Sequence, residues 1–170
     1  MKSKTLCRQS CHPELVSGSI LEAVTPFLVQ AKQATYASGK KAEASLSGGK
    51  QFEFISDDFC YRDIYFGEQF FVGQEIVYFK NSPIWSMCYS GGLMASSDIE
   101  VQKGVYAFLK EALKNVPREF PVRGPSVIEY EKLKYKNEIM GELGRFCGFE
   151  EIYFEENVLY QLHYAGGLIK

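Results

Sequence analysis

The chain has 170 residues, enough for one domain but not for two domains of the usual size. Hydrophobic residues make up 46% and charged residues 24%, a globular composition that excludes a wholly disordered chain. The 19 basic and 21 acidic side chains leave a net charge of −2, so no direct nucleic-acid binding is expected, since such surfaces are usually basic. The aromatic content of 15% favours β-strands.

The first 19 residues carry no sustained apolar period, and we predict that they form a disordered extension before a single domain at residues 20–170. Cys7, Cys11 and His12 lie close together there, but a metal site needs a further ligand and a rigid frame, so no metal is expected. Residues 11–19 also resemble translated copies of a repetitive element of some bacterial genomes. It is therefore open whether residues 1–19 belong to the native protein.

The cysteine count and the absence of long apolar runs bear on location. Five cysteines are an odd number in a chain that is long for a disulfide scaffold, so the sequence predicts reduced thiols and a cytoplasmic protein. No segment approaches the 18 or so apolar residues of a membrane span, so no membrane partner is expected. The oligomeric state stays undetermined.

Two helices are predicted from apolar residues that recur at helical spacing. The stripe of the first helix is Ile20, Val24, Phe27, Leu28 and Ala31. Thr25 and Pro26 leave its start open, because they also fit a cap followed by proline in the first turn. The second helix is predicted to begin at a capping box of Ser97 and Glu100 and to end before Pro117. Its stripe is Val101, Val105, Phe108, Leu109 and Ala112.

Eight strands are predicted as four hairpins, from alternating apolar residues between turn signals. They are residues 51–56, 59–63, 74–80, 83–90, 127–131, 133–138, 149–155 and 158–164. Residues 71–94 align with residues 146–169 without a gap, and nine of these 24 positions are identical. We therefore predict an α+β fold in which an internally duplicated unit of one helix and four strands, at 20–94 and 95–170, forms one curved antiparallel sheet with two helices.

The hairpin register selects the candidate site. A turn at Asn81 and Ser82 places Glu75 opposite Cys88, and the matching turn in the second half places Glu150 opposite His163. The other face of the sheet then carries Trp85, Met87, Tyr89, Tyr160, Leu162 and Tyr164.

The polar face of this register has two interpretations. The carboxylates and the histidine are solvated, or they line a cavity between the halves. In a cavity, a glutamate beside the histidine suits a general base, and a nearby cysteine suits a nucleophile.

Arginines add candidates outside this register. Arg123 precedes Gly124 and Pro125 on a predicted loop, and its guanidinium fits a carboxylate or phosphate ligand, or a salt bridge within the domain, for example to Asp63. Arg62 lies next to Asp63 on a predicted strand. No cofactor motif appears. The ligand-binding candidates are Glu75, Cys88, Glu150, His163, Arg62, Arg123, Trp85, Tyr89 and Tyr164.

Several motifs in order resemble a known family between Phe27 and Lys170. They are AKQATYASG at 31–39, YRDIYFG at 61–67, GQEIV at 73–77, WSMCY at 85–89, RGP at 123–125 and YQLHYAGGLI at 160–169. The family is an uncharacterised bacterial and archaeal domain of unknown function, also found behind Xre-type helix-turn-helix regulators. The resemblance implies an effector-sensing or interaction role without assigning catalytic residues, and no helix-turn-helix signature appears in this sequence.

The sequence thus predicts a domain that binds or senses a small-molecule ligand, without a DNA-binding part. The alternatives are a small enzyme that uses a Glu/His pair and a protein-interaction domain. A cavity lined by charged groups would favour ligand binding or catalysis, and a flat exposed aromatic patch would favour protein interaction.

Overall fold

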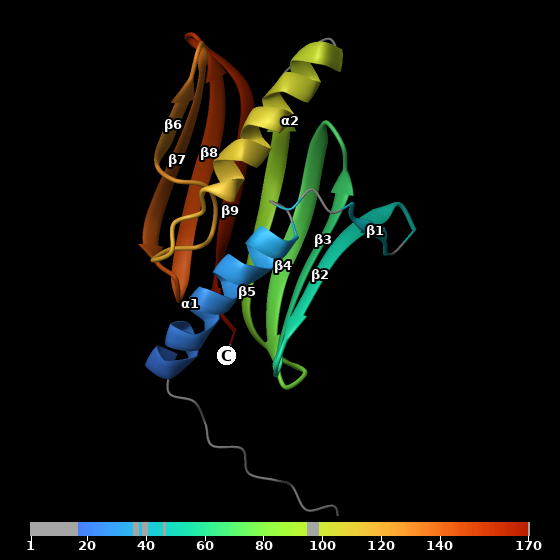
Figure 1. Ribbon diagram of the computed structural model, residues 1–170, viewed down its shortest axis with the longest axis vertical. Helices are drawn as coiled ribbons and strands as arrows, with labels where there is room; N and C mark the ends of the chain where they lie inside the picture. The colour runs from blue at the N-terminus through green and yellow to red at the C-terminus, as the bar shows by residue number, and fades with distance from the viewer. Residues whose placement is uncertain (1–16, 36–37, 39–40, 46, 95–98, 170) are drawn as a thin grey trace, which may run out of the picture.

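The computed structural model describes residues 17–35, 38, 41–45, 47–94 and 99–169, which form two helices and nine strands (Figure 1). They are α1 (Ser17–Ala34), β1 (Glu43–Ala44), β2 (Gly49–Ser56), β3 (Phe59–Gly67), β4 (Phe70–Phe79), β5 (Ser82–Leu93), α2 (Ile99–Lys114), β6 (Val127–Tyr130), β7 (Leu133–Glu142), β8 (Arg145–Phe154) and β9 (Asn157–Leu168). The strands form one antiparallel sheet, and both helices lie across the same face of it (Figure 1). The predicted α+β class is confirmed.

The strand order is β1-β2-β3-β4-β5-β9-β8-β7-β6, so the first half of the chain forms a five-strand meander and the second a four-strand one. The short strand β1, at Glu43–Ala44, was not predicted. The two meanders join where β5 pairs with β9, with Trp85 opposite Leu168 and Leu93 opposite Tyr160. The centre of the sheet is therefore built from strands that are far apart in the sequence. The core fills the space between the sheet and the helices.

Helix α1 begins earlier than the alternative start at Thr25 and Pro26. It runs from Ser17, so Pro26 lies inside the helix, where it removes one backbone hydrogen bond. The predicted stripe explains why the helix tolerates this loss, because Val24 and Leu28 are fully buried. Residues 17–19 thus belong to the helix, whereas residues 1–16, with Cys7, Cys11 and His12, lie outside the described residues.

Helix α2 buries its predicted apolar stripe except at Val101, which is 39% exposed. Val105, Phe108, Leu109 and Ala112 are buried, and the helix ends at Lys114, three residues before Pro117. The predicted cap, Ser97, lies outside the described residues. Both helices therefore bury the faces that helical periodicity indicates.

The predicted register of the β4–β5 hairpin is wrong by one residue. The turn consists of Lys80 and Asn81, both with positive φ, and a β-bulge next to it shifts the register between Val77 and Tyr78. The bulge decides which side chains share a face of the sheet, because one extra residue moves every later side chain to the opposite face. The β8–β9 hairpin has a bulge between Ile152 and Tyr153 and the same consequence.

The bulges separate the side chains that the sequence paired. Glu75 lies opposite Met87 instead of Cys88, and Glu150 lies opposite Leu162 instead of His163. Both glutamates therefore point into the core, on the same face as Trp85, Tyr89 and Tyr164, which contradicts the prediction of opposite faces. Cys88 and His163 are exposed on the other face.

Candidate functional site

A buried ion pair joins helix α1 to the sheet. The Lys32 ammonium donates to both carboxylate oxygens of Glu75, at 2.7 and 2.9 Å, and to the carbonyl oxygen of Val122 at 2.7 Å. Lys32 is buried on the helix face that is directed at the core, and all three N–H donors of its ammonium are used by these contacts. The contact to Val122 also fixes the loop between α2 and β6.

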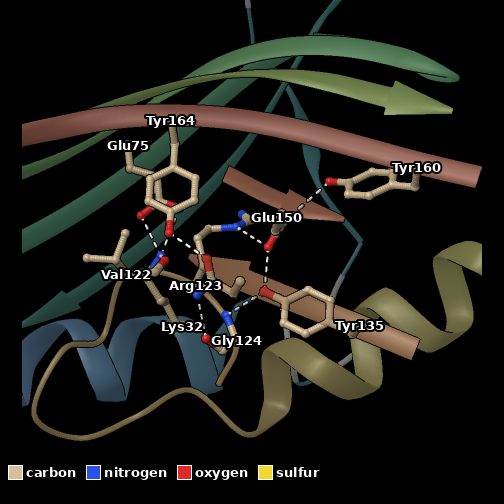
Figure 2. Close-up of polar contacts among 10 residues, drawn as sticks. Lys32, Glu75, Val122, Arg123, Gly124, Tyr135, Glu150, Tyr160 and Tyr164 are labelled. Carbon is tan, nitrogen blue, oxygen red and sulfur yellow. Dashed lines mark hydrogen bonds and ion pairs between the residues drawn. The ribbon is translucent and has the colours of Figure 1, made fainter. Parts of the chain in front are cut away.

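A second buried ion pair lies beside the first and involves the same loop. Arg123 donates from Nε to Glu150 at 3.0 Å and also from Nη2 to the other carboxylate oxygen (Figure 2). Arg123 is 4% exposed and Glu150 is fully buried. Burial lowers the pKa of Arg123, but the charge of Glu150 and its hydrogen bonds together raise that pKa well above its usual value. The partner expected for Arg123, Asp63, is thus replaced by Glu150.

Tyrosine hydroxyls complete the surroundings of Glu150. Tyr135 donates to Glu150 at 2.6 Å and Tyr160 donates to it at 3.0 Å (Figure 2). Burial, followed by the negative charge of Glu150, raises the pKa of Tyr135 well above its usual value. The Tyr135 hydroxyl therefore remains a protonated donor. With Arg123 and the two tyrosines, the buried carboxylate is saturated with hydrogen bonds.

A tyrosine lies over a glycine in each half of the sheet. Tyr89 donates to Asp63 at 2.6 Å and crosses Gly73, and Tyr164 donates to Asn137 at 2.5 Å and crosses Gly148. A Cβ atom on Gly73 would lie 2.4 Å from the Tyr89 hydroxyl, and one on Gly148 would lie 2.5 Å from the Tyr164 hydroxyl. The two glycines therefore make room for the two tyrosine rings.

We expect Gly73→Ala and Gly148→Ala each to lower the free energy of unfolding by about 1–3 kcal/mol, since the added methyl overpacks the core. Urea unfolding followed by circular dichroism measures the loss. The matched control is Gly104→Ala on α2, where the new methyl meets open space and should stabilise the helix by about 0.5–1 kcal/mol. A neutral result at position 73 or 148 would contradict this packing.

Asp63 is the one acidic group of this buried cluster that has no cation in ion-pair contact among the described residues. Burial and then repulsion from Glu75 raise its pKa to about 7, although the Tyr89 hydrogen bond, Lys32 and Arg123 lower it. A carboxyl group that titrates near neutral pH inside a protein is a frequent mark of a functional site.

A cavity of about 790 Å³ lies between α2 and strands β2 to β5, next to this cluster. Its aromatic lining consists of Phe52, Tyr65, Phe71, Tyr89 and Tyr106. The Tyr106 hydroxyl lies 2.9 Å from the carbonyl oxygens of both Glu68 and Gln69, which share its one proton, so α2 is tied to the β3–β4 turn at the cavity wall. The cavity thus has a fixed aromatic wall.

Cations predominate around this cavity. Among the described lining residues, Lys50, Lys103, Lys110 and Arg123 carry positive charge and Glu68 alone carries a carboxylate, which pairs with Lys50 at 3.0 Å. Arg123 is the lining residue that also belongs to the buried ion pairs. The arrangement can bind a small organic anion, with its charge at Arg123 and its apolar part against the aromatic rings.

The uncovered face of the sheet carries a separate groove of about 620 Å³. Cys88 and His163 line it together with Cys147, so the structure does bring the predicted cysteine and histidine to one surface. Glu75 and Glu150 lie on the other face, and the predicted Glu150/His163 general-base pair is therefore wrong. The groove has no buried carboxylate to activate the histidine.

The remaining predicted site residues, Arg62 and Trp85, contact other residues of the fold and lie outside the cavity. Arg62 is exposed and pairs with Glu53 at 2.6 Å. Trp85 is fully buried and donates from its indole nitrogen to the carbonyl oxygen of Leu143 at 3.0 Å. Neither residue lines the cavity under α2.

The described part of the chain offers no metal site and no membrane helix. No group of three or more His, Cys, Asp or Glu side chains within it is arranged to hold a metal ion. Neither described helix is long and apolar enough to cross a bilayer. The described cysteines, Cys60, Cys88 and Cys147, are free thiols.

Sequence reasoning missed three members of the buried cluster, which are Lys32 and the tyrosine pair Tyr61 and Tyr135; Tyr61 is buried beside Glu75 and Asp63. A signal for Lys32 existed, since it follows Ala31 and lies four residues after Leu28 on the apolar side of α1. The pair was also visible, because Tyr61 and Tyr135 occupy matching places in the two halves. Buried polar residues at matching positions were thus the useful signal.

Comparison with known proteins places the chain in a family. No curated protein and no solved structure gives a significant match. Residues 63–169 match the family described as Domain of unknown function (DUF5680), and the matched segment contains Asp63, Glu75, Arg123 and Glu150. Because the match extends over more than half of the sequence, the chain belongs to the DUF5680 family.

Proposed function

We propose that this protein binds a small organic anion in the cavity under α2, as a binding or sensing domain. The observation that carries the proposal is the position of Arg123, which is almost fully buried and lines a cavity of about 790 Å³. This volume falls within the range of about 300–1,000 Å³ that small-molecule sites usually have.

The hydrogen bonds of Arg123 leave donors for a ligand. Its Nε and Nη2 atoms bond to Glu150, and no described residue accepts a hydrogen bond from Nη1. A guanidinium has five N–H donors in a planar fork that suits carboxylate, sulfonate and phosphate groups. Lys110, which lines the cavity from α2, adds a second positive charge for the same anion.

The aromatic lining favours a ligand with a flat apolar part. Phe71 contacts Tyr89 and Tyr106 with ring centroids 6.0 and 6.5 Å apart, so the wall is a continuous aromatic surface. Planar rings stack on or pack edgewise against such a surface. An aromatic carboxylate, sulfonate or phosphate therefore fits both the charge and the lining.

The test compares two fluorescent probes with the same aromatic rings. The anionic probe is 8-anilinonaphthalene-1-sulfonate (ANS), and the neutral one is N-phenyl-1-naphthylamine. We expect ANS to bind one site and to bind it at least tenfold more tightly than the neutral probe, because only ANS can use Arg123. Fluorescence titration of the full chain measures both dissociation constants.

Charge reversals on α2 supply the matched controls. Lys110→Glu should weaken ANS binding severalfold, whereas Lys114→Glu should leave it unchanged, since Lys114 is exposed and does not line the cavity. Equal affinity for the two probes would contradict the proposal. So would loss of ANS binding in a Val72→Asp variant with normal binding in Lys110→Glu, because Val72 lines the groove on the uncovered face.

A protein-interaction role is the second candidate, and the uncovered face of the sheet favours it. Val72 and Met140 line the groove there and are 45% and 65% exposed, and Phe70 on β4 is 63% exposed. Exposed apolar side chains that cluster on one face are typical of protein contacts. If two copies associate through this face, sedimentation should show a dimer that Val72→Asp converts to a monomer.

We also propose that the two halves arose by internal duplication. The bulges at Val77/Tyr78 and Ile152/Tyr153 and the glycines at 73 and 148 all keep the offset of 75 residues found in the sequence. The ion pairs differ, because α1 supplies the cation for Glu75 and a loop supplies it for Glu150. The cavity lies over the first half, which suggests that the halves have since diverged.

A further inference from the structure

Asp63 is buried in a setting that opposes its negative charge. It is 2% exposed, lies opposite Glu75 across β3 and β4, and accepts a hydrogen bond from Tyr89. The nearby cations already contact other carboxylates, since Lys32 pairs with Glu75 and Arg123 pairs with Glu150. The two pairs are neutral, so an ionised Asp63 leaves the buried cluster with one excess negative charge.

The second half of the sheet has a neutral group at the matching place. Asn137 lies opposite Glu150 as Asp63 lies opposite Glu75, and it accepts a hydrogen bond from Tyr164 as Asp63 does from Tyr89. In the second half, an amide therefore accepts the hydrogen bond of the equivalent tyrosine without adding a charge. The ionisable carboxyl of Asp63 is not needed for this packing.

Asp63 is separated from the cavity by one layer of side chains. Tyr89, its hydrogen-bond donor, and Arg123, whose charge lowers its pKa, both line the cavity. An anion bound at Arg123 would therefore add negative charge within a few side chains of the Asp63 carboxylate. In a medium of low polarity, like charges this close repel strongly.

We propose, on the basis of the proposed function, that binding of an organic anion in this cavity is coupled to uptake of a proton by Asp63. Protonation of Asp63 removes the excess negative charge of the cluster when the bound anion adds a negative charge nearby. The affinity for the anion should therefore be highest at low pH and fall as the pH rises through neutrality.

The groups that face Asp63 support a titration in this range. Glu75 on β4 repels it, Lys32 on α1 and Arg123 on the loop attract it, and β5 supplies the Tyr89 hydroxyl. Tyr61 on the same strand is also close, and its own pKa is raised by burial, Glu75 and Asp63, so it stays neutral. From β2, the opposite residue is Phe52, and α2 contributes Lys103, Tyr106 and Lys110 to the adjoining cavity.

The direction of proton transfer follows from the charge of Asp63 in the ligand-free protein. With its pKa at about 7, Asp63 is mostly ionised at pH 7.5. A bound anion, by repulsion and by screening Arg123, raises this pKa further, and a proton is taken up. The affinity changes by about tenfold per pH unit at most for one coupled proton.

Isothermal titration calorimetry with ANS at pH 7.5, in triethanolamine and in Tris, measures the proton uptake, because neither buffer base is an anion that competes for the site. The sulfonate of ANS does not titrate near neutral pH, so a difference in heat between the two buffers reports on the protein. We expect uptake of up to one proton by the wild-type chain. Asp63→Asn should bind ANS more tightly at pH 7.5, take up no proton, and show an affinity independent of pH between 6.5 and 8.5.

A matched control is the exposed histidine on the other face. His163→Gln should retain the full proton uptake, because His163 does not line the cavity. Uptake that disappears in His163→Gln but persists in Asp63→Asn would overturn the assignment. Binding of ANS with no buffer-dependent heat would overturn the coupling and leave the proposed function intact. Failure of ANS to bind would overturn both.

A ligand-free measurement tests the titration of Asp63 separately. The folded pKa of about 7 lies above the unfolded value of about 3.9, so the native state loses stability at this group as the pH rises from about 4 to 7. The melting temperature of Asp63→Asn, relative to wild type, should rise over this interval and then level off above pH 8. A difference that is constant with pH would overturn the proposal.

Discussion

Arg123→Met is expected to lower the free energy of unfolding by about 3–5 kcal/mol, the usual cost of breaking a buried ion pair on one side. The methionine fills most of the volume but leaves the carboxylate of Glu150 fully buried without a cation. The hydroxyls of Tyr135 and Tyr160 still donate to Glu150, but they do not neutralise it. Urea unfolding followed by the fluorescence of Trp85 measures the loss.

Removing the second charge should restore part of this stability. In the double variant Arg123→Met/Glu150→Gln, the amide needs no counterion, and the variant should unfold at a higher urea concentration than Arg123→Met alone. The control is Lys132→Met, which breaks an ion pair whose side chains are 65% and 53% exposed and should cost less than about 1 kcal/mol. A loss in Arg123→Met as small as that of the control would refute a structural role for the buried pair.

The same variant also tests the proposed anion site. Arg123→Met, where it is folded, should bind ANS no more tightly than the neutral naphthylamine probe. Glu150→Gln keeps the guanidinium and should therefore keep the preference for ANS. The pair of variants separates loss of the anion contact from a general loss of packing.

Trp85→Ala should cost about 3–5 kcal/mol, because it removes the largest fully buried side chain of the described core. The indole stacks on Phe146 with ring centroids 5.8 Å apart, and its N–H donates to the carbonyl oxygen of Leu143. Trp85 lies on β5, whereas Phe146 and Leu143 lie in the second half of the chain. The void left by the missing indole would therefore form where the two meanders join.

Two further variants serve as references for the stability loss in Trp85→Ala. Trp85→Phe keeps a ring but loses the donor to Leu143, and should cost less than the alanine variant. Tyr130→Ala, at a side chain that is 65% exposed, should cost less than about 0.5 kcal/mol. Circular dichroism replaces fluorescence, since the single tryptophan is lost. Equal losses in Trp85→Ala and Tyr130→Ala would contradict the central position of the indole.

Local patterns predicted both helices and eight of the nine strands, and missed the two-residue strand β1. The stripe that includes Val24 and Leu28 predicted the buried face of α1, and the stripe from Val105 to Ala112 predicted that of α2. Strands were predicted shorter than they are, because the apolar alternation weakens near the glycines that end hairpins. The family was also recognisable from the sequence, since its motifs are short runs of consecutive residues.

The candidate site required the tertiary structure. Lys32 and Glu75 are 43 residues apart, and Arg123 and Glu150 are 27 apart, so no local pattern indicates that they meet. The cavity likewise depends on how α2 lies over β2 to β5. Arg123 was a correct candidate for a buried contact, but its partner could not be chosen by sequence distance.

The faces of the central strands show most clearly where the sequence stops being sufficient. The alternation along β4 and β5 correctly separates Trp85 and Tyr89 from Cys88, because strand geometry has a period of two residues. Whether Glu75 shares the face of Tyr89 depends on one bulge at Val77/Tyr78, which carries no distinctive residue. Packing decides it: this bulge directs Glu75 to the ammonium of Lys32, and the bulge at Ile152/Tyr153 directs Glu150 to the guanidinium of Arg123. Both contacts form only when the helix and the loop lie against the sheet.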